Sequence, residues 1–296
     1  MSGSSNTPSI AGNKILITGA NGQLGKELRQ IASKYDQFEL IFLSREDLPI
    51  HHFEMVRHYF SVYHPIFLIN CAAYTAVDRA ESEKDLAYQV NAEAVGVLAA
   101  VCKENNCRFI HISTDYVFDG NAKTPYKEDV ETNPQTIYGK SKLEGEKQAL
   151  ELNPDSLIIR TSWVYSSFGK NFVRTMLKLM AEKDEINVVS DQVGSPTYAA
   201  DLADAIMHII ASGKWKPGIF HYSNDGAISW YDFAVAIKEI TENNCKINPI
   251  PTSQYPTPAK RPLYSVLDKT KISSIYSISI NNWKKSLTVC LQLLDK

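Results

Sequence analysis

Short apolar segments alternate with stretches of helical periodicity through the first half of the 296-residue chain, and this alternation constrains the fold more than any other feature. The apolar, β-rich runs are expected to be strands and cover residues 14–19, 38–43, 66–70, 108–114 and 156–162. The helical segments between them cover residues 21–33, 55–63, 84–104 and 138–150. Buried strands that alternate with helices are typical of a parallel sheet covered on both faces. We therefore predict an α/β fold with a Rossmann-type, doubly wound parallel sheet.

The second half of the chain has a looser pattern. Helices are expected over residues 170–183, 199–213 and 228–244, and the Pro-rich segment 249–262 is expected to lie extended on the surface. We predict a disordered tail over 1–12, a dinucleotide-binding domain over 13–163, and a smaller lobe over 164–296. This lobe is expected to bind mainly substrate and to interleave with the sheet.

Composition excludes several classes of protein. The net charge is −2, which gives no attraction for nucleic acid, and no run of about 18 apolar residues exists that could span a membrane. The first residues lack the basic and apolar regions of a secretory signal. Five cysteines without a CxxC pair indicate free thiols in the cytoplasm. The seven histidines show no metal-binding spacing, so we read them as surface or core residues and assign no metal ligand.

A glycine-rich turn follows the first predicted strand. Gly19, Gly22 and Gly25 form the stretch GANGQLG and open a helix. Glycines let the backbone approach a pyrophosphate closely, and the helix N-terminus offers free N–H groups and a positive dipole end. We expect this turn to bind a dinucleotide; the alternative is an ordinary strand-to-helix turn.

The next two strand ends bear on which cofactor binds. Ser44 and Arg45 follow the second strand, and an Arg there favours the 2′-phosphate of NADPH. If Arg45 instead pairs with Glu46 or Asp47 on the surface, NADH would serve equally. After the third strand, Ala72 and Ala73 are small enough for a nucleotide to lie against the backbone, although tight packing alone would also explain them.

A proton donor is suggested by Tyr138 and Lys142, which lie four residues apart in the first turns of a predicted helix and share one face. The nearby ammonium is expected to lower the pKa of the phenol and so favour proton transfer to a carbonyl oxygen. Thr114 ends the fourth strand, and its hydroxyl is expected to face the same crevice as the glycine turn. The alternatives are a solvated helix face for the pair and a turn-capping role for Thr114.

Six stretches together resemble the extended short-chain dehydrogenase/reductases, and within them the dTDP-4-dehydrorhamnose reductase family, over residues 13 to 294. They are GANGQLG, NCAAYTAVDRAE, STDYVFDG, YGKSKLEGE, RTSWVYSSFGKNFVRTML and DQVGSPTYAADLA. The resemblance implies reduction of the C4 ketone of dTDP-4-dehydro-L-rhamnose by NAD(P)H, which gives dTDP-L-rhamnose. A nucleotide sugar is therefore the expected partner of the chain.

The resemblance also implies roles for residues. Tyr138 is the general acid, Lys142 lowers its pKa and binds the nicotinamide ribose, and Thr114 orients the ketone oxygen. The residues implied to contact cofactor are Gly19, Asn21, Gly22, Gln23, Leu24, Ser44, Arg45, Ala72, Ala73, Tyr74, Thr75, Tyr138 and Lys142. The residues implied to contact substrate are Thr114, Asp115, Tyr116, Trp163, Asn171 and Arg261. Core packing for Trp163 and a surface ion pair for Arg261 are the open alternatives.

The sequence departs from the family at two places. Pro49 stands where the family often carries an acid, which removes a carboxylate and an N–H donor beside the adenosine. Ser166 stands where a Gly is usual, which is expected to alter one loop. Some members hold Mg²⁺ at a dimer contact, so a homodimer and a magnesium ion stay open, without ligands that can be assigned here.

Two other functions fit the same fold. One is a nucleotide-sugar epimerase or dehydratase, which would retain NAD tightly and show no net cofactor turnover. The other is a non-catalytic regulatory subunit similar to the beta subunit of methionine adenosyltransferase. The complete set of Thr114, Tyr138 and Lys142 favours the reductase, because a binding module needs no proton donor.

Overall fold

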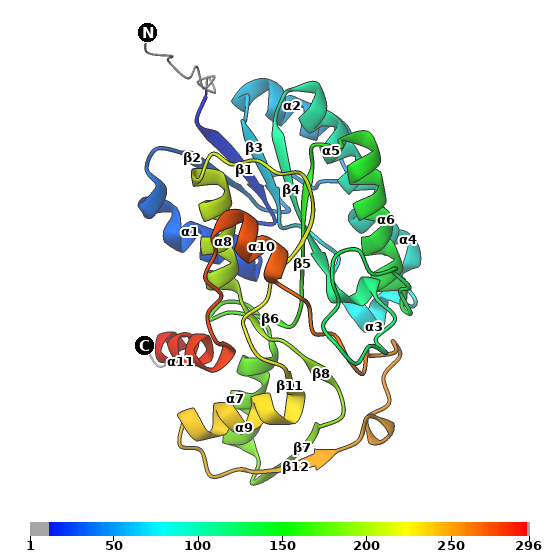
Figure 1. Ribbon diagram of the computed structural model, residues 1–296, viewed down its shortest axis with the longest axis vertical. Coiled ribbons are helices and arrows are strands. Elements are labelled where there is room, and N and C mark those ends of the chain that lie inside the picture. Colours follow the sequence, from blue (N-terminus) through cyan, green and yellow to red (C-terminus); the bar gives the residue numbers. More distant parts are fainter. Residues whose placement is uncertain (1–11, 295–296) are drawn as a thin grey trace.

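A parallel six-stranded sheet forms the centre of the fold in the computed structural model, which describes residues 12–294 (Figure 1). The tail predicted over 1–12 lies outside the described residues, apart from Gly12. The strand order is β10-β5-β4-β3-β1-β2. The five predicted strands are confirmed as β1 (Lys14–Thr18), β2 (Glu39–Leu43), β3 (Phe67–Asn70), β4 (Arg108–Thr114) and β5 (Leu157–Thr161). The sixth strand, β10 (Gly218–His221), was not predicted and pairs with β5.

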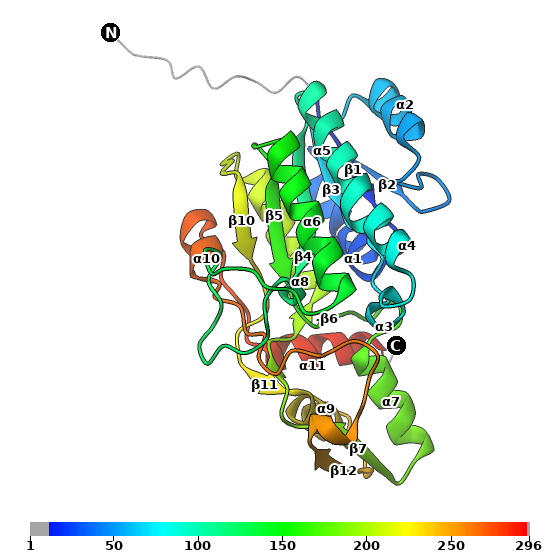
Figure 2. The ribbon, with the colours of Figure 1, turned by 90° about the vertical axis from the view of Figure 1, so that its right-hand side faces the viewer.

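Helices cover both faces of the sheet, as predicted. On one face, α1 (Gln23–Ile31), α8 (Ala199–Ala211) and α10 (Thr270–Tyr276) bury an apolar cluster against the strands. On the other face lie α2 (Phe53–Tyr63), α5 (Ala94–Glu104) and α6 (Ile137–Leu152) (Figure 2). Because all strands of this sheet run parallel, their carboxyl ends, with the glycine and polar turns that follow them, lie at the same edge.

The helix predicted over 84–104 contains an irregular turn. It begins as α4 (Lys84–Tyr88), passes through one π-helical turn, η2 (Gln89–Glu93), and continues as α5. Such turns are rare and frequently occur at functional sites. Here the π turn contains Asn91, whose buried side chain reaches out of the helix to the loop after β3.

Much of the chain after residue 163 forms a second layer below the sheet in Figure 1. Its helices α7 (Phe172–Glu182), α9 (Trp230–Ile240) and α11 (Trp283–Leu294) share an apolar core. Its three small sheets are β6 (Val164–Tyr165) with β9 (Thr197–Tyr198), β7 (Glu185–Val189) with β12 (Lys246–Ile250), and β8 (Val193–Gly194) with β11 (Ile228–Ser229). The chain crosses between the two layers, because α8, β10 and α10 belong to the main sheet. The division at residue 163 remains a prediction.

The Pro-rich segment 249–262 departs from the prediction at its start. Pro249 and Ile250 complete β12 and pair with β7, and the short 3₁₀ turn η4 (Thr252–Gln254) follows. Pro249 is tolerated there because this two-stranded sheet leaves one edge of β12 without a partner strand. No helix of the described chain is both long enough and apolar enough to cross a membrane.

Candidate functional site

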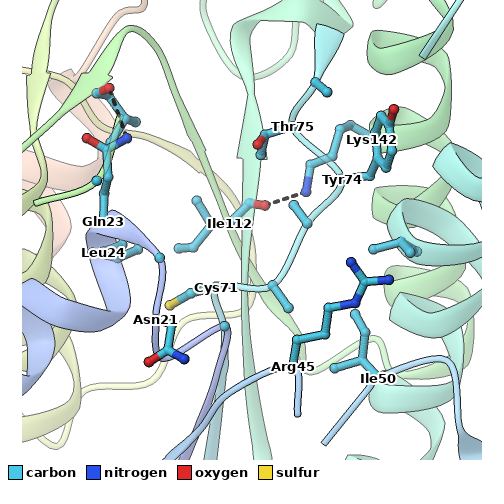
Figure 3. Close-up of a pocket in the computed structure, with 18 of the residues that line it drawn as sticks. Asn21, Gln23, Leu24, Arg45, Ile50, Cys71, Tyr74, Thr75, Ile112 and Lys142 are labelled. Atoms are coloured by element: carbon cyan, nitrogen blue, oxygen red, sulfur yellow. Dashed lines mark hydrogen bonds between the residues drawn. The ribbon is translucent and has the colours of Figure 1, made fainter. Parts of the chain in front are cut away.

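A cavity of about 780 Å³ opens at the carboxyl ends of β1, β3 and β4. Among the residues that line it are all the predicted cofactor contacts except Ser44, namely Gly19, Asn21, Gly22, Gln23, Leu24, Arg45, Ala72, Ala73, Tyr74, Thr75, Tyr138 and Lys142. Figure 3 shows Asn21, Gln23 and Leu24 on one side of this cavity, with Arg45, Tyr74 and Lys142 on the other. Sequence positions more than 100 residues apart therefore meet in one elongated site.

The glycine turn approaches the backbone of the loop after β3 too closely for any side chain. Gly19 has φ +66°, and a Cβ on it would lie 2.7 Å from the backbone N of Ala72. A Cβ on Gly25 would lie 2.6 Å from the Gly19 carbonyl oxygen, which keeps α1 tight against the turn. Gly22 caps α1 without a side-chain hydrogen bond, so the first N–H groups of the helix are left for an anion.

Ser44 and Arg45, directly after β2, have different roles: Ser44 holds the turn together and Arg45 lines the cavity. Ser44 is buried and does not line the cavity; its N–H donates to Asp47 Oδ2 at 2.9 Å, and its Oγ accepts from the Glu46 and Asp47 N–H groups. This turn presents Arg45, which is exposed and extends into the cavity in Figure 3. Within residues 12–294, Arg45 forms no ion pair with Glu46 or Asp47, so the surface-pair alternative is not what the structure contains.

The loop after β3 is held by a residue that the sequence analysis missed. Asn91 accepts from the Tyr74 N–H at 2.8 Å through Oδ1 and donates to the Tyr74 carbonyl at 3.0 Å through Nδ2. Its amide also donates to the Ser141 hydroxyl on α6 at 3.1 Å. Asn91 thus fixes the Ala72–Thr75 wall of the cavity against the helix that carries Tyr138. The same stretch also contains the polar Gln89 and Glu93, so no local signal singled out Asn91.

Helix α6 positions Tyr138 and Lys142 within the cavity wall. Thr136 caps this helix by accepting from the Gly139 N–H, and Gly139 packs so closely on the Tyr116 carbonyl that no side chain fits. Tyr138 is 9% exposed and Lys142 is 1% exposed. The ammonium or amine of Lys142 donates to the Ile112 carbonyl at 2.6 Å, as the dashed line in Figure 3 marks.

The structure corrects the expected direction of one pKa shift. Burial raises the pKa of Tyr138, with the Thr114 hydroxyl opposing, whereas the sequence analysis expected Lys142 to lower it. Lys142 has no such effect here because its own Nζ turns to β4 and because burial lowers its pKa to about 8, with Glu146 opposing. At neutral pH the Tyr138 phenol is therefore un-ionised, so Tyr138 and Lys142 do not form an ion pair.

The predicted substrate residues at the end of β4 lie beside the main cavity rather than in its lining. Thr114 Oγ1 donates to Asp115 Oδ1 at 3.0 Å and accepts from the Tyr116 N–H, so it caps the 3₁₀ turn η3 (Asp115–Val117). This is the capping alternative of the sequence analysis. Burial raises the pKa of Asp115 to about 6.

Arg261 and Tyr116 meet at a second, small pocket that Lys260 also lines. Arg261 Nη2 lies 2.6 Å from Asp78 Oδ2, in the helical turn α3 (Val77–Ala80), which is the ion-pair alternative of the sequence analysis. The Asp78 carboxylate also accepts from the Ala259 N–H at 3.2 Å. These bonds tie the 251–263 segment to the dinucleotide half of the chain.

Trp163 and Asn171 lie in the connection to the second layer. Trp163 has φ +48° and stacks on Trp230 with ring centroids 3.5 Å apart, so packing occupies one of its faces. Asn171 caps α7 and donates to Gln23 Oε1 at 2.9 Å, at the glycine turn. Ser166, the departure from the family Gly, donates to the buried carboxylate of Glu27 on α1.

No three His, Cys, Asp or Glu side chains gather to hold a metal ion anywhere in residues 12–294, so magnesium has no cluster of ligands there. All five cysteines are free thiols, and four of them are buried.

Comparisons with known proteins agree with this geometry. The family model described as "RmlD substrate binding domain" matches residues 13–296. The dTDP-4-dehydrorhamnose reductase of Aggregatibacter actinomycetemcomitans is 42% identical over 93% of this chain and 97% of its own length. The enzyme of the same name from Escherichia coli is 38% identical over 91% and 94%.

Solved structures show the same relationship. A dTDP-4-dehydrorhamnose reductase from Clostridium acetobutylicum superimposes with a TM-score of 0.91 at 45% identity, covering 96% of this chain and all of that one. The Bacillus anthracis enzyme, solved in complex with NADP, gives 0.91 at 36% identity, covering 95% and 99%. The chain therefore belongs to the dTDP-4-dehydrorhamnose reductase family.

Proposed function

We propose that this chain reduces the C4 ketone of dTDP-4-dehydro-L-rhamnose and forms dTDP-L-rhamnose, with NADPH as the hydride donor. One observation carries the proposal: a single cavity brings the glycine turn together with Tyr138 and Lys142. A dinucleotide whose pyrophosphate binds at the start of α1 would place its nicotinamide near the phenol on α6. The hydride and the proton would then reach the same carbonyl group. Relatives of this name at about 40% identity support the choice of substrate.

The residues of this chain would divide the work as follows. NADPH would supply the hydride when bound. Tyr138 would donate its proton to the ketone oxygen, and its raised pKa keeps that proton in place before the reaction. Thr114, which opposes this rise, is close enough to orient the same oxygen. Asp115, Tyr116, Trp163, Asn171 and Arg261 are proposed to contact the nucleotide sugar.

Arg45 favours NADPH over NADH. Its guanidinium extends from an ordered turn into the cavity and has no carboxylate partner among the described residues, so it is available for a 2′-phosphate. Pro49, also in the cavity wall, offers no carboxylate that would repel this phosphate. The NADP found in the Bacillus anthracis relative agrees with this preference.

The test is to follow the loss of NADPH absorbance with a panel of nucleotide-linked 4-keto sugars. The proposal expects stoichiometric NADPH oxidation with dTDP-4-dehydro-L-rhamnose and slower reaction with other nucleotides or sugars. An epimerase or dehydratase would consume no net NADPH, and a regulatory subunit would turn over none of the sugars. Either result would overturn the proposal.

Replacement of Tyr138 by Phe tests the proton donor. We expect turnover to fall by about 10²–10⁴-fold with little change in NADPH affinity, because only the acidic hydroxyl is lost. Tyr63→Phe on α2, outside the cavity lining, is the matched control and should leave turnover unchanged. Turnover close to wild type in Tyr138→Phe would remove Tyr138 from this role.

Compartment and assembly complete the proposal. A reducing cytoplasm suits five free thiols, and the second layer of the fold is proposed to hold the sugar nucleotide. A homodimer remains a prediction that rests on the family resemblance.

A further inference from the structure

A chain of buried polar side chains runs beneath the cavity and ends at Lys142. Thr18 Oγ1 donates to Asn70 Oδ1 at 2.6 Å, and Asn70 Nδ2 lies 3.0 Å from His111 Nδ1. His111 Nε2 lies 3.1 Å from Lys142 Nζ. Thr18, Asn70 and His111 are fully buried. The chain joins the ends of β1 and β3 to β4 and α6.

The donors and acceptors around Asn70 determine which way its side-chain amide points. Its Oδ1 accepts from the Thr18 hydroxyl and also from the Ala72 N–H at 3.2 Å, and a backbone N–H can only donate. The oxygen must therefore face Ala72, which turns the Nδ2 amide toward His111. Because this amide also only donates, Nδ1 of His111 must accept and carries no proton.

The same rules for donors and acceptors determine the tautomer of His111. With Nδ1 unprotonated, the ring is neutral and its proton is on Nε2, which faces Lys142 Nζ. An N–H can donate to an amine but not to an ammonium, which has no lone pair. Lys142 still donates to the Ile112 carbonyl at 2.6 Å, which an uncharged amine can also do. Every bond in the chain is satisfied only when Lys142 is uncharged.

We propose that His111 is a positioning residue that favours the uncharged amine of Lys142, and that cofactor binding draws Lys142 from this contact and favours the ammonium, which takes its proton from solvent. The inference rests on the proposed function, in which Lys142 binds the nicotinamide ribose. Ribose hydroxyl oxygens accept hydrogen bonds, so they favour the ammonium that His111 disfavours. Cofactor binding and protonation of Lys142 are then linked.

The groups around Lys142 agree with this assignment. Burial lowers its pKa to about 8, and burial also lowers the pKa of His111 well below its ordinary value. Glu146, one turn further along α6, favours the charged amine but is neutralised by Arg160 of β5. On the remaining side, burial raises the pKa of Tyr138 and, on the β3 loop, of Cys71, so both are uncharged in this range.

The first test is a pH titration of the protein without nucleotide, monitored by NMR of lysine side chains labelled with ¹³C at Cε. One lysine resonance, identified by its loss in Lys142→Met, should titrate near pH 8 while the others titrate near 10. In His111→Gln, whose amide oxygen can accept from an ammonium, this midpoint should rise by about one pH unit or more. An exposed control, Lys140→Met, should leave it unchanged. A Lys142 midpoint near those of the other lysines, or one unchanged in His111→Gln, would overturn the inference.

The second test measures proton uptake when NADP⁺ binds, by calorimetry in buffers of different ionisation enthalpy. Little uptake is expected near pH 6.5, and uptake approaching one proton is expected near pH 9, where free Lys142 is mostly uncharged. Binding without uptake at the higher pH overturns the inference and leaves the proposed function intact. Absence of NADP⁺ binding at any pH would instead count against the proposed function itself.

Discussion

Replacement of Arg160 by Met should strongly destabilise the fold, because it removes the ion pair that attaches helix α6 to the sheet. Arg160 on β5 lies 2.6 Å from Glu146 Oε2 through Nη2, and its Nε donates to the same carboxylate at 2.9 Å. Both side chains are 2% exposed. Glu146 follows Lys142 by one helical turn, so this ion pair attaches α6 to the sheet directly behind the cavity.

The expected loss follows from what the substitution leaves behind. Without Arg160, the buried Glu146 carboxylate keeps, among residues 12–294, only the Ser113 hydroxyl as a side-chain hydrogen-bond partner. Removing one member of a buried pair costs about 3–5 kcal/mol, because the remaining charge cannot be solvated. The pair between Arg57 and Glu104 has the same chemistry, but its side chains are 50% and 53% exposed, so Arg57→Met should cost about 1 kcal/mol or less.

Urea denaturation, monitored by tryptophan fluorescence, gives the free energies of unfolding of Arg160→Met and Arg57→Met. A third variant, in which Arg160→Met is combined with Glu146→Leu, should recover much of the loss, because the buried charge is then gone and only Ser113 lacks its partner. If Arg160→Met lies within 1 kcal/mol of wild type, or if the double variant is less stable than the single one, the ion pair does not have the role assigned to it.

Two more predictions concern the cofactor walls. Arg45→Ala should weaken binding of NADPH, measured by fluorescence titration, by about tenfold or more and change NADH binding little; equal losses for both would exclude Arg45 as the phosphate contact. Asn91→Leu removes both bonds to the Tyr74 backbone and should cost about 1–3 kcal/mol of stability in urea while weakening both nucleotides alike. An Asn91→Leu variant with wild-type stability would contradict the role given to the π turn.

The sheet was largely predictable because its strands are continuous apolar runs flanked by turn residues. β10 was missed because it pairs with β5 only after the chain has passed through much of the second layer. Nothing local marks Gly218–His221 as part of the main sheet. Its place is fixed by non-local pairing, which periodicity does not report.

The cofactor walls were predictable for a similar reason. In a parallel sheet every strand end reaches the same edge, so the glycine turn after β1 and the two alanines after β3 lie together there, and the helix after β4 brings the Tyr–Lys pair to the same edge. The side chains that hold these walls were not predictable. Asn70, Asn91 and His111 act through buried hydrogen bonds to partners 17 to 52 residues away in the sequence, and the histidine had been classed only as a surface or core residue.

Tyr138 and Lys142 show where spacing stops being informative. Four-residue spacing correctly placed both side chains on one face, yet it did not predict which way the amine points. The Lys142 Nζ is bound to His111 and to the Ile112 carbonyl on β4, and burial is the main cause of the shift in the Tyr138 pKa. If cofactor binding moves Lys142 from His111 to the ribose, the ammonium approaches the phenol only in the loaded enzyme. The lowered Tyr pKa expected from the sequence would then belong to that complex, which makes the movement of Lys142 to the ribose, with proton uptake above about pH 8, a condition of catalysis.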